Sequence, residues 1–174
     1  EEKKIYSSVK NEEMSIRVPV RYRFKAPLHK VMVAYQQKMT ERSSSPTTRV
    51  RVQVVDVQEH SATYKVTRTM PAWYRLLGGR SQTEYVETLT VEDGKMITSA
   101  KQDLPFGGQA ETKIIFVDNG GTETAVFGTV SASNLPRAAQ AVAKRMFRGF
   151  VQKTFAEERT VETSLLSNLA TTVD

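Results

Sequence analysis

"SASNLPRAAQAVAKRMFRGFVQKTFAEERTVETSLLSNL", residues 131–169, is the stretch that decides the fold. Ser133 or Asn134 suits the N-cap of a helix, and Pro136 suits its first turn. Apolar residues follow at helical spacing, at Leu135, Ala139, Val142, Met146, Phe150 and Val151, joined by Phe147 and Phe155. The pattern predicts one long amphipathic helix that reaches about Val161 or the end of the stretch. Such a helix needs an apolar surface to cover, and the preceding strands supply it.

The residues before this helix alternate between apolar and polar, as β-strands do. Residues 14–25 place Met14, Ile16, Val18, Val20, Tyr22 and Phe24 on one side and Ser15, Arg17, Pro19, Arg21, Arg23 and Lys25 on the other. This period of two predicts a strand with one apolar and one basic face. Pro19 has no N–H to donate to a neighbour, so an edge strand or a bulge is expected there. Further strands are predicted at about residues 49–57, 62–69, 83–91, 95–102, 111–118 and 122–132.

A first helix and two tight turns complete the pattern. Pro27 opens a helix that runs to about Lys38, and residues 41–48 have the composition of a polar loop. "EDGK" at 92–95 and "DNGG" at 118–121 are typical hairpin turns. The order of elements predicts an α+β fold, in which an antiparallel sheet of about seven strands curves strongly around the long C-terminal helix. This is the helix-grip arrangement.

Two connections in this sheet are unexpectedly apolar. They are "MPAWYRLLGG" at 70–79 and "LPFGG" at 104–108. A curved sheet that does not close on its helix leaves a hollow in which ligands bind, and these connections are predicted to be lids over it that also touch a membrane. The lid residues are Met70, Pro71, Trp73, Tyr74, Leu76, Leu77, Gly78, Gly79, Leu104 and Phe106. The alternative is an ordinary loop whose apolar residues plug the core.

Several stretches resemble a known family. The order of elements resembles the START-like (Bet v 1-type) superfamily, and within it "MPAWYRLLGG" resembles the lid stretch of the PRELI/MSF1 (slowmo) proteins. "FKAPLHKVMVAY" at 24–35 is similar to the opening segment of that family, and "TEYVET" at 83–88 is similar to the strand after its lid. The sequence departs from the family at Leu28, where a tryptophan is usual, and at 38–46, where "KMTERSSSP" replaces a Lys-Tyr-Pro-Asn-Pro segment.

The resemblance implies a carrier that moves an anionic phospholipid, phosphatidic acid or phosphatidylserine, between membranes. It also implies a small helical-hairpin partner protein, transient contact with a membrane surface, and the mitochondrial intermembrane space or otherwise the cytoplasm. By position it implies headgroup contacts from Arg21, Arg23, Lys25, Lys144, Arg148 and Lys153. A phosphate carried into a low-dielectric hollow does need positive charge nearby. The alternative for these six residues is that they face water, as most basic side chains do.

Two other functions stay open at this point. One is a START-like binder of another hydrophobic ligand, such as a sterol or isoprenoid. The other is a module that is recruited to membrane surfaces without transferring lipid. The net charge of +6 fits anionic partners of any of these kinds. Residues 1–13 are a charged lead, and residues 14–174 are expected to form one domain.

The sequence contains no motif for a metal site, a catalytic nucleophile, a phosphate loop or a nucleic-acid surface. The chain has no Cys, and its two histidines, His29 and His60, are not in a metal-ligand spacing. No nucleophile motif or phosphate loop occurs, and no basic strand interleaves with aromatic residues as in nucleic-acid binders. We therefore expect no cofactor, no metal, no nucleic-acid partner and no enzymatic activity.

Overall fold

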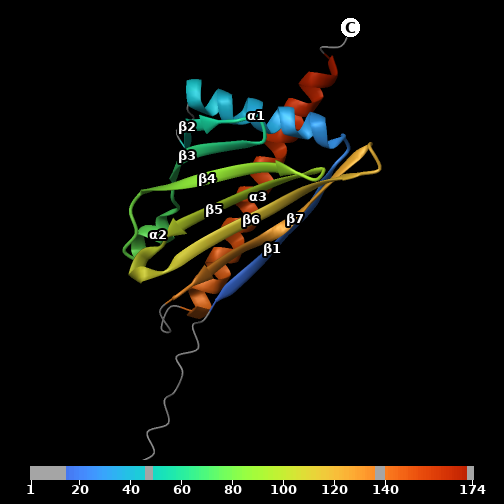
Figure 1. Ribbon diagram of the computed structural model, residues 1–174. Helices are drawn as coiled ribbons and strands as arrows, with labels where there is room; N and C mark the ends of the chain where they lie inside the picture. The colour runs from blue at the N-terminus through green and yellow to red at the C-terminus, as the bar shows by residue number, and fades with distance from the viewer. Residues whose placement is uncertain (1–14, 46–48, 136–139, 172–174) are drawn as a thin grey trace, which may run out of the picture.

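The computed structural model describes residues 15–45, 49–135 and 140–171. The expectations for residues 1–14 and for the start of the last helix at Pro136 lie outside this part of the chain. The elements are β1 (Ile16–Phe24), α1 (Leu28–Ser44), β2 (Val50–Val57), β3 (Ser61–Thr69), α2 (Ala72–Leu76), β4 (Gln82–Glu92), β5 (Lys95–Asp103), the 3₁₀ turn η1 (Pro105–Gly107), β6 (Gln109–Asn119), β7 (Glu123–Ser133) and α3 (Gln140–Thr171). Figure 1 shows the seven strands in one sheet with α3 behind it.

The sheet is antiparallel throughout, in the order β1-β7-β6-β5-β4-β3-β2. The long-range pairing of β1 with β7 places β1 at an edge, which confirms the prediction made from Pro19. The two hairpin turns are also confirmed, because Asp93 and Gly94 have φ of 47° and 71°, and Gly120 and Gly121 have φ of 69° and 78°. These left-handed conformations suit the aspartate and glycines of the two turn sequences.

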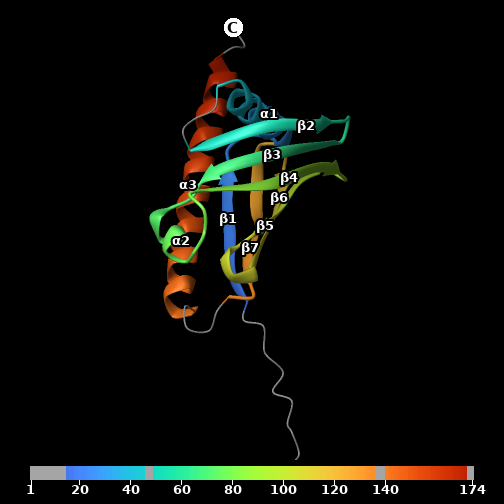
Figure 2. The same ribbon diagram turned by 90° about the vertical axis from the view of Figure 1, so that its left-hand side faces the viewer.

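The sheet is strongly curved. In Figure 2 the strands β2 to β4 run across the view while β1 and β7 run up it, and α3 lies along the hollow side. Gly128 stands at a crowded point of this bend, where an added Cβ would lie 2.0 Å from the carbonyl oxygen of Lys113 on β6. A glycine in a strand often marks such a bend or a close backbone approach. The predicted helix-grip architecture is therefore confirmed.

The core forms where the inward faces of the strands meet one side of α3. The alternation predicted for β1 is seen directly, since Ile16, Val18, Val20 and Phe24 are buried while Arg17, Arg21 and Arg23 are exposed. Ala143, Phe147, Val151 and Leu165 are the buried apolar residues of α3. Burial of this apolar surface is the main stabilising contribution.

One helix is longer than the sequence predicted, one ends close to a predicted limit, and one was not predicted. α1 continues to Ser44 through half of the expected polar loop, where Thr40 carbonyl oxygen accepts hydrogen bonds from the hydroxyls of Ser43 and Ser44. Polar residues in the last turns of a helix need no apolar surface, so periodicity did not reveal them. α3 ends at Thr171, just beyond Leu169, the further of its two predicted ends, and α2 occupies the middle of the connection that was expected to be a lid loop.

Candidate ligand-binding cavity

A cavity of about 150 Å³ lies between α3 and the hollow face of the sheet. Its lining comes from all seven strands, from α1 and α3, and from the two apolar connections. Most of its side chains are apolar, among them Met39, Val52, Val66, Ile114, Phe116, Val130, Phe147 and Val151. An apolar cavity of about this volume is known to hold a guest of the size of benzene. Concave apolar sites with a few polar groups are typical of ligand binding.

The two apolar connections cover one end of the cavity. Met70, Trp73, Tyr74 and Leu104 line it. The Trp73 ring stands edge-on to the ring of Phe150 on α3, with 6.2 Å between centroids. The hydroxyl of Tyr74 donates to the carbonyl oxygen of Asp103 at 3.4 Å and so connects the first connection to the end of β5, directly before the second. The cover is thus fastened to α3 by ring contacts and to the sheet by one long hydrogen bond.

The remaining residues of the predicted lid divide between cover and surface. Pro71 and Leu77 are half-buried, Gly78 is exposed, and Leu76 is 86% exposed. Gly79 packs so closely on Tyr74 that an added Cβ would meet its ring carbons at 2.2 Å. The side chain of Phe106 lies outside the described part of the structure.

Charged side chains gather at the end of the cavity next to α1. Glu158 of α3 accepts hydrogen bonds from Lys38 Nζ at 2.7 Å and from Arg42 Nη1 at 3.0 Å. Arg68 Nη2 on β3 lies 3.4 Å from Glu158 Oε1. Lys38 also donates to Glu162 Oε1 at 2.7 Å. These five residues, which we call the ionic cluster, join α1, β3 and α3, and all five line the cavity.

The ionic cluster shifts the pKa values of its own carboxyls in opposite directions. Burial alone would raise the pKa of Glu158, but Lys38, Arg42 and Arg68 lower it well below its usual value. For Glu162 burial prevails over the attraction of Lys38, and its pKa is raised. Burial would lower the pKa of Lys38, but Glu158 and Glu162 raise it above its usual value. Glu158 is therefore the firmly ionised acid of the pair.

Glu162 has one carboxyl oxygen with no hydrogen-bond partner. Its Oε2 is buried and unpaired, while Oε1 holds Lys38, and the residue is only 2% exposed. A buried charged oxygen without a donor is costly, and protonation removes that cost. The geometry and the raised pKa both favour the neutral acid at this position.

A second polar pair lies beside the ionic cluster. The Tyr35 hydroxyl on α1 donates to Glu87 Oε1 on β4. Burial raises the pKa of Glu87, and the Tyr35 hydrogen bond and Lys38 offset this only in part. Tyr35 is packed between Lys38, whose Nζ lies 4.2 Å from the ring centroid, and Phe116 at 6.1 Å. A carboxyl and a phenol thus face an apolar space side by side.

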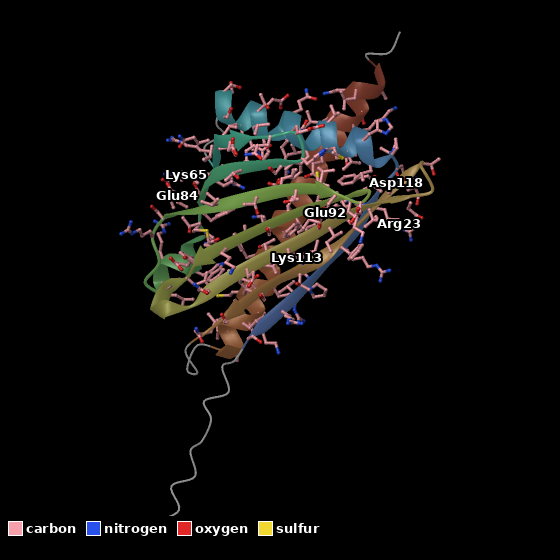
Figure 3. The ribbon with its side chains drawn as sticks, in the orientation of Figure 1. Arg23, Lys65, Glu84, Glu92, Lys113 and Asp118 are labelled. Carbon is pink, nitrogen blue, oxygen red and sulfur yellow. The ribbon has the colours of Figure 1, made fainter. Side chains whose placement is uncertain are left out.

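None of the six predicted headgroup residues lines the cavity. Arg21, Arg23 and Lys25 on and after β1, and Lys144, Arg148 and Lys153 on α3, are all exposed. Arg23 is 71% exposed at the outer edge of the sheet, 3.7 Å from Glu123 (Figure 3). The apolar partners of the β1 stripe occupy the inward side of that strand, so these side chains face outward, and their contact with a headgroup stays a prediction. The cations that line the cavity are Lys38, Arg42 and Arg68.

The chain has a Bet v 1/START-like helix-grip fold. A Zhui aromatase/cyclase from Streptomyces sp. R1128 matches with a TM-score of 0.62 and 7% identity over 88% of this chain and 94% of that one. Norcoclaurine synthase from Thalictrum flavum matches with a TM-score of 0.55 and 9% identity over 91% and 87%. Ara h 8.0201 matches with a TM-score of 0.54 and 13% identity over 88% and 99%. No family model and no curated sequence matches the chain.

These neighbours support the START-like fold but not the narrower resemblance to PRELI/MSF1 proteins. They also correct the expectation that the chain is not an enzyme, because an aromatase/cyclase and norcoclaurine synthase share its architecture. Function depends on the site and not on the fold alone, so the lack of a sequence motif does not exclude catalysis. Among the described residues no helix is both long and apolar enough to span a membrane.

Proposed function

We propose that this protein binds a small hydrophobic molecule in the cavity between α3 and the sheet, beneath the cover of α2 and η1. The observation that carries the proposal is the arrangement of the cavity itself: apolar walls, an aromatic cover at one end and the ionic cluster at the other. One structure with this fold is norcoclaurine synthase in complex with dopamine and hydroxybenzaldehyde, two small aromatic molecules, which supports a ligand of that size.

A cavity-filling substitution tests this proposal. Ala100 lines the cavity from β5, so Ala100→Phe places a ring in the space where the ligand would lie. We expect the fluorescent apolar probe N-phenyl-1-naphthylamine to bind the natural chain and to bind Ala100→Phe at least tenfold more weakly. Ala156→Phe makes the same change at an exposed position of α3 and should bind normally. Equal binding by both variants would place the probe outside the cavity and refute the proposal.

A second candidate function is acid–base conversion of the bound molecule, which the Tyr35–Glu87 pair favours. A carboxyl whose pKa is raised by burial can exchange a proton with a bound molecule, and a phenol beside it can stabilise an oxygen that gains charge. Small aryl ketones in deuterated water provide the test, with exchange at the carbon next to the carbonyl followed by NMR. Glu87→Gln should abolish protein-dependent exchange while probe binding persists. Exchange that is equal in Glu87→Gln would exclude this role.

The narrower function of anionic phospholipid transfer is supported by one surface feature. Leu76 on α2, and Val142 and Met146 on α3, are exposed apolar residues near the cover, with exposed Arg75 and Arg145 on the same helices. Such a surface suits an anionic membrane. Two acyl chains need far more room than 150 Å³, so the cover would have to open widely. Mass spectrometry after incubation with a lipid extract decides: a stoichiometric phospholipid supports transfer, and a small ligand or none argues against it.

A further inference from the structure

Resting on the proposed binding function, we propose that the ionic cluster binds the anionic group of the ligand, a carboxylate or similar compact anion at the end of a hydrophobic body, with Arg68 as its main contact. The first step of the argument is the charge of the cluster. Three cations, Lys38, Arg42 and Arg68, converge on the single firmly ionised acid Glu158.

The second step concerns the other acids that face these cations. A charged Glu162 would leave Oε2 unpaired in a buried site, which favours the neutral acid, and the charge count takes Glu162 as the neutral member of the cluster. Glu87 is the remaining carboxyl of the cavity lining. If Glu87 is ionised, the cavity keeps one uncompensated positive charge, and if it is protonated, the cavity keeps two. An anionic ligand supplies the missing negative charge in either state.

The third step identifies the cation that is free to meet a ligand. Lys38 is 4% exposed and makes two contacts of 2.7 Å, so two of its three N–H donors are committed, and its Nζ lies 4.2 Å from the Tyr35 ring centroid. Arg68 contacts Glu158 only at 3.4 Å, longer than the usual 2.9–3.0 Å of an N–H···O bond. Its side chain is 15% exposed and shares a hydrogen bond with the Tyr85 hydroxyl, which also lines the cavity. A guanidinium has five N–H donors and binds a carboxylate in a bidentate manner.

The fourth step is the direction of the ligand. Arg68 lies at the end of β3, and the chain passes from there through Met70 into the cover. The cover end is apolar and aromatic, and the walls between it and the cluster are mostly apolar. A molecule with one anionic end therefore fits with its hydrophobic body under Trp73 and its charge at Arg68. A phospholipid phosphate and a free carboxylic acid would both satisfy this chemistry.

Three matched ligands that differ only in the head group test the proposal: 4-butylbenzoate, 4-butylbenzyl alcohol and 4-butylbenzylamine. Trp73 is the only tryptophan and lines the cavity, so its fluorescence reports binding. We expect the natural chain to bind the benzoate at least tenfold more tightly than the alcohol and to bind the ammonium most weakly. Equal affinity for benzoate and alcohol, or a preference for the ammonium, would overturn the anion site while the binding function stands. No binding of any of the three would overturn both.

Substitutions locate the site. Arg68→Gln should reduce the preference for benzoate over alcohol to less than threefold and leave alcohol affinity within threefold of the natural chain. Arg51→Gln removes the same charge from an exposed position on the neighbouring β2 and should keep the preference. Glu162→Gln mimics the neutral acid and should also keep the preference for benzoate over alcohol. A tenfold gain in benzoate affinity in Glu162→Gln would show that Glu162 is charged in the natural chain and would contradict the charge argument. The head-group series on the natural chain remains decisive if Arg68→Gln does not fold.

Discussion

Replacing Glu158 by glutamine should remove a large share of the stability of this protein. The carboxylate accepts from Lys38 at 2.7 Å and from Arg42 at 3.0 Å, and its side chain is only 13% exposed. An amide of the same shape leaves these cations without their ionised partner. Removing one partner of a buried ion pair costs about 3–5 kcal/mol, and the lower figure of about 3 kcal/mol applies because Arg42 keeps some contact with water at 14% exposure.

In a domain of this size each kcal/mol lowers Tm by about 2–4 °C, so Glu158→Gln should melt about 6–12 °C below the natural chain. Circular dichroism melts at pH 7 measure this. The adjacent Glu157 is the matched control, because it lies 3.8 Å from Arg49 with both side chains about half exposed or more. Exposed pairs contribute about 0–1 kcal/mol, so Glu157→Gln should change Tm by less than about 4 °C. If both variants melt alike, the ionic cluster is no stronger than a surface pair and the reasoning fails.

Three further predictions concern the acid with the raised pKa, the cover and the sheet. Because burial raises the pKa of folded Glu162, the natural chain should lose stability as pH rises above the pKa of the unfolded residue, about 4.3, whereas Glu162→Gln should not. The Tm of Glu162→Gln should therefore equal that of the natural chain at pH 4 and exceed it at pH 7.5. A variant that is less stable than the natural chain at pH 7.5 would mean that Lys38 holds Glu162 ionised. Trp73→Ala removes the ring contact with Phe150 and should speed the release of N-phenyl-1-naphthylamine about tenfold in stopped-flow experiments. Leu76→Ala, at an 86% exposed position of the same cover, should release the probe at the rate of the natural chain. Equal release rates for the two variants would argue against a cover. Gly128→Ala brings a Cβ within 2.0 Å of a neighbouring carbonyl oxygen and should lower the free energy of unfolding in urea by at least about 2 kcal/mol. Gly149→Ala, with open space around it in α3, should raise that free energy by about 1 kcal/mol. A Gly128→Ala variant as stable as the natural chain would contradict the close approach of β6 and β7.

The fold could be predicted because each of its elements leaves a local signal. The alternation in β1, the turn at Asp93–Gly94 and the apolar stripe of α3 are each set by residues close in sequence. Pro19 indicated an edge strand or a bulge, since its missing donor is tolerated at both, and β1 is the edge strand. The length of α1 escaped prediction because its final turns are polar.

The ionic cluster was missed, although the sequence holds a signal for it. The buried positions of α3 follow helical spacing from Phe147 through Val151, and the same spacing continues to Glu158 and Glu162. On α1, Lys38 likewise follows Tyr35 on the buried side. Charges at core positions of two amphipathic helices must find partners, so the two patterns together predict an ion pair between the helices. Arg68 could not be found in this way, because its place in the cavity depends on the curvature of the whole sheet.

The ionic cluster is better explained by ligand binding than by stability. Losing one member of a buried ion group is costly, but replacing the whole group by apolar residues of similar volume is often neutral or stabilising. A need for stability alone therefore gives no reason to place Lys38, Glu158 and Glu162 against an apolar cavity. What apolar side chains cannot supply is a polar end that fixes the direction of a guest and discriminates between head groups. The loosely held Arg68 makes sense on this view, because its N–H donors lack the one partner that an anionic ligand brings.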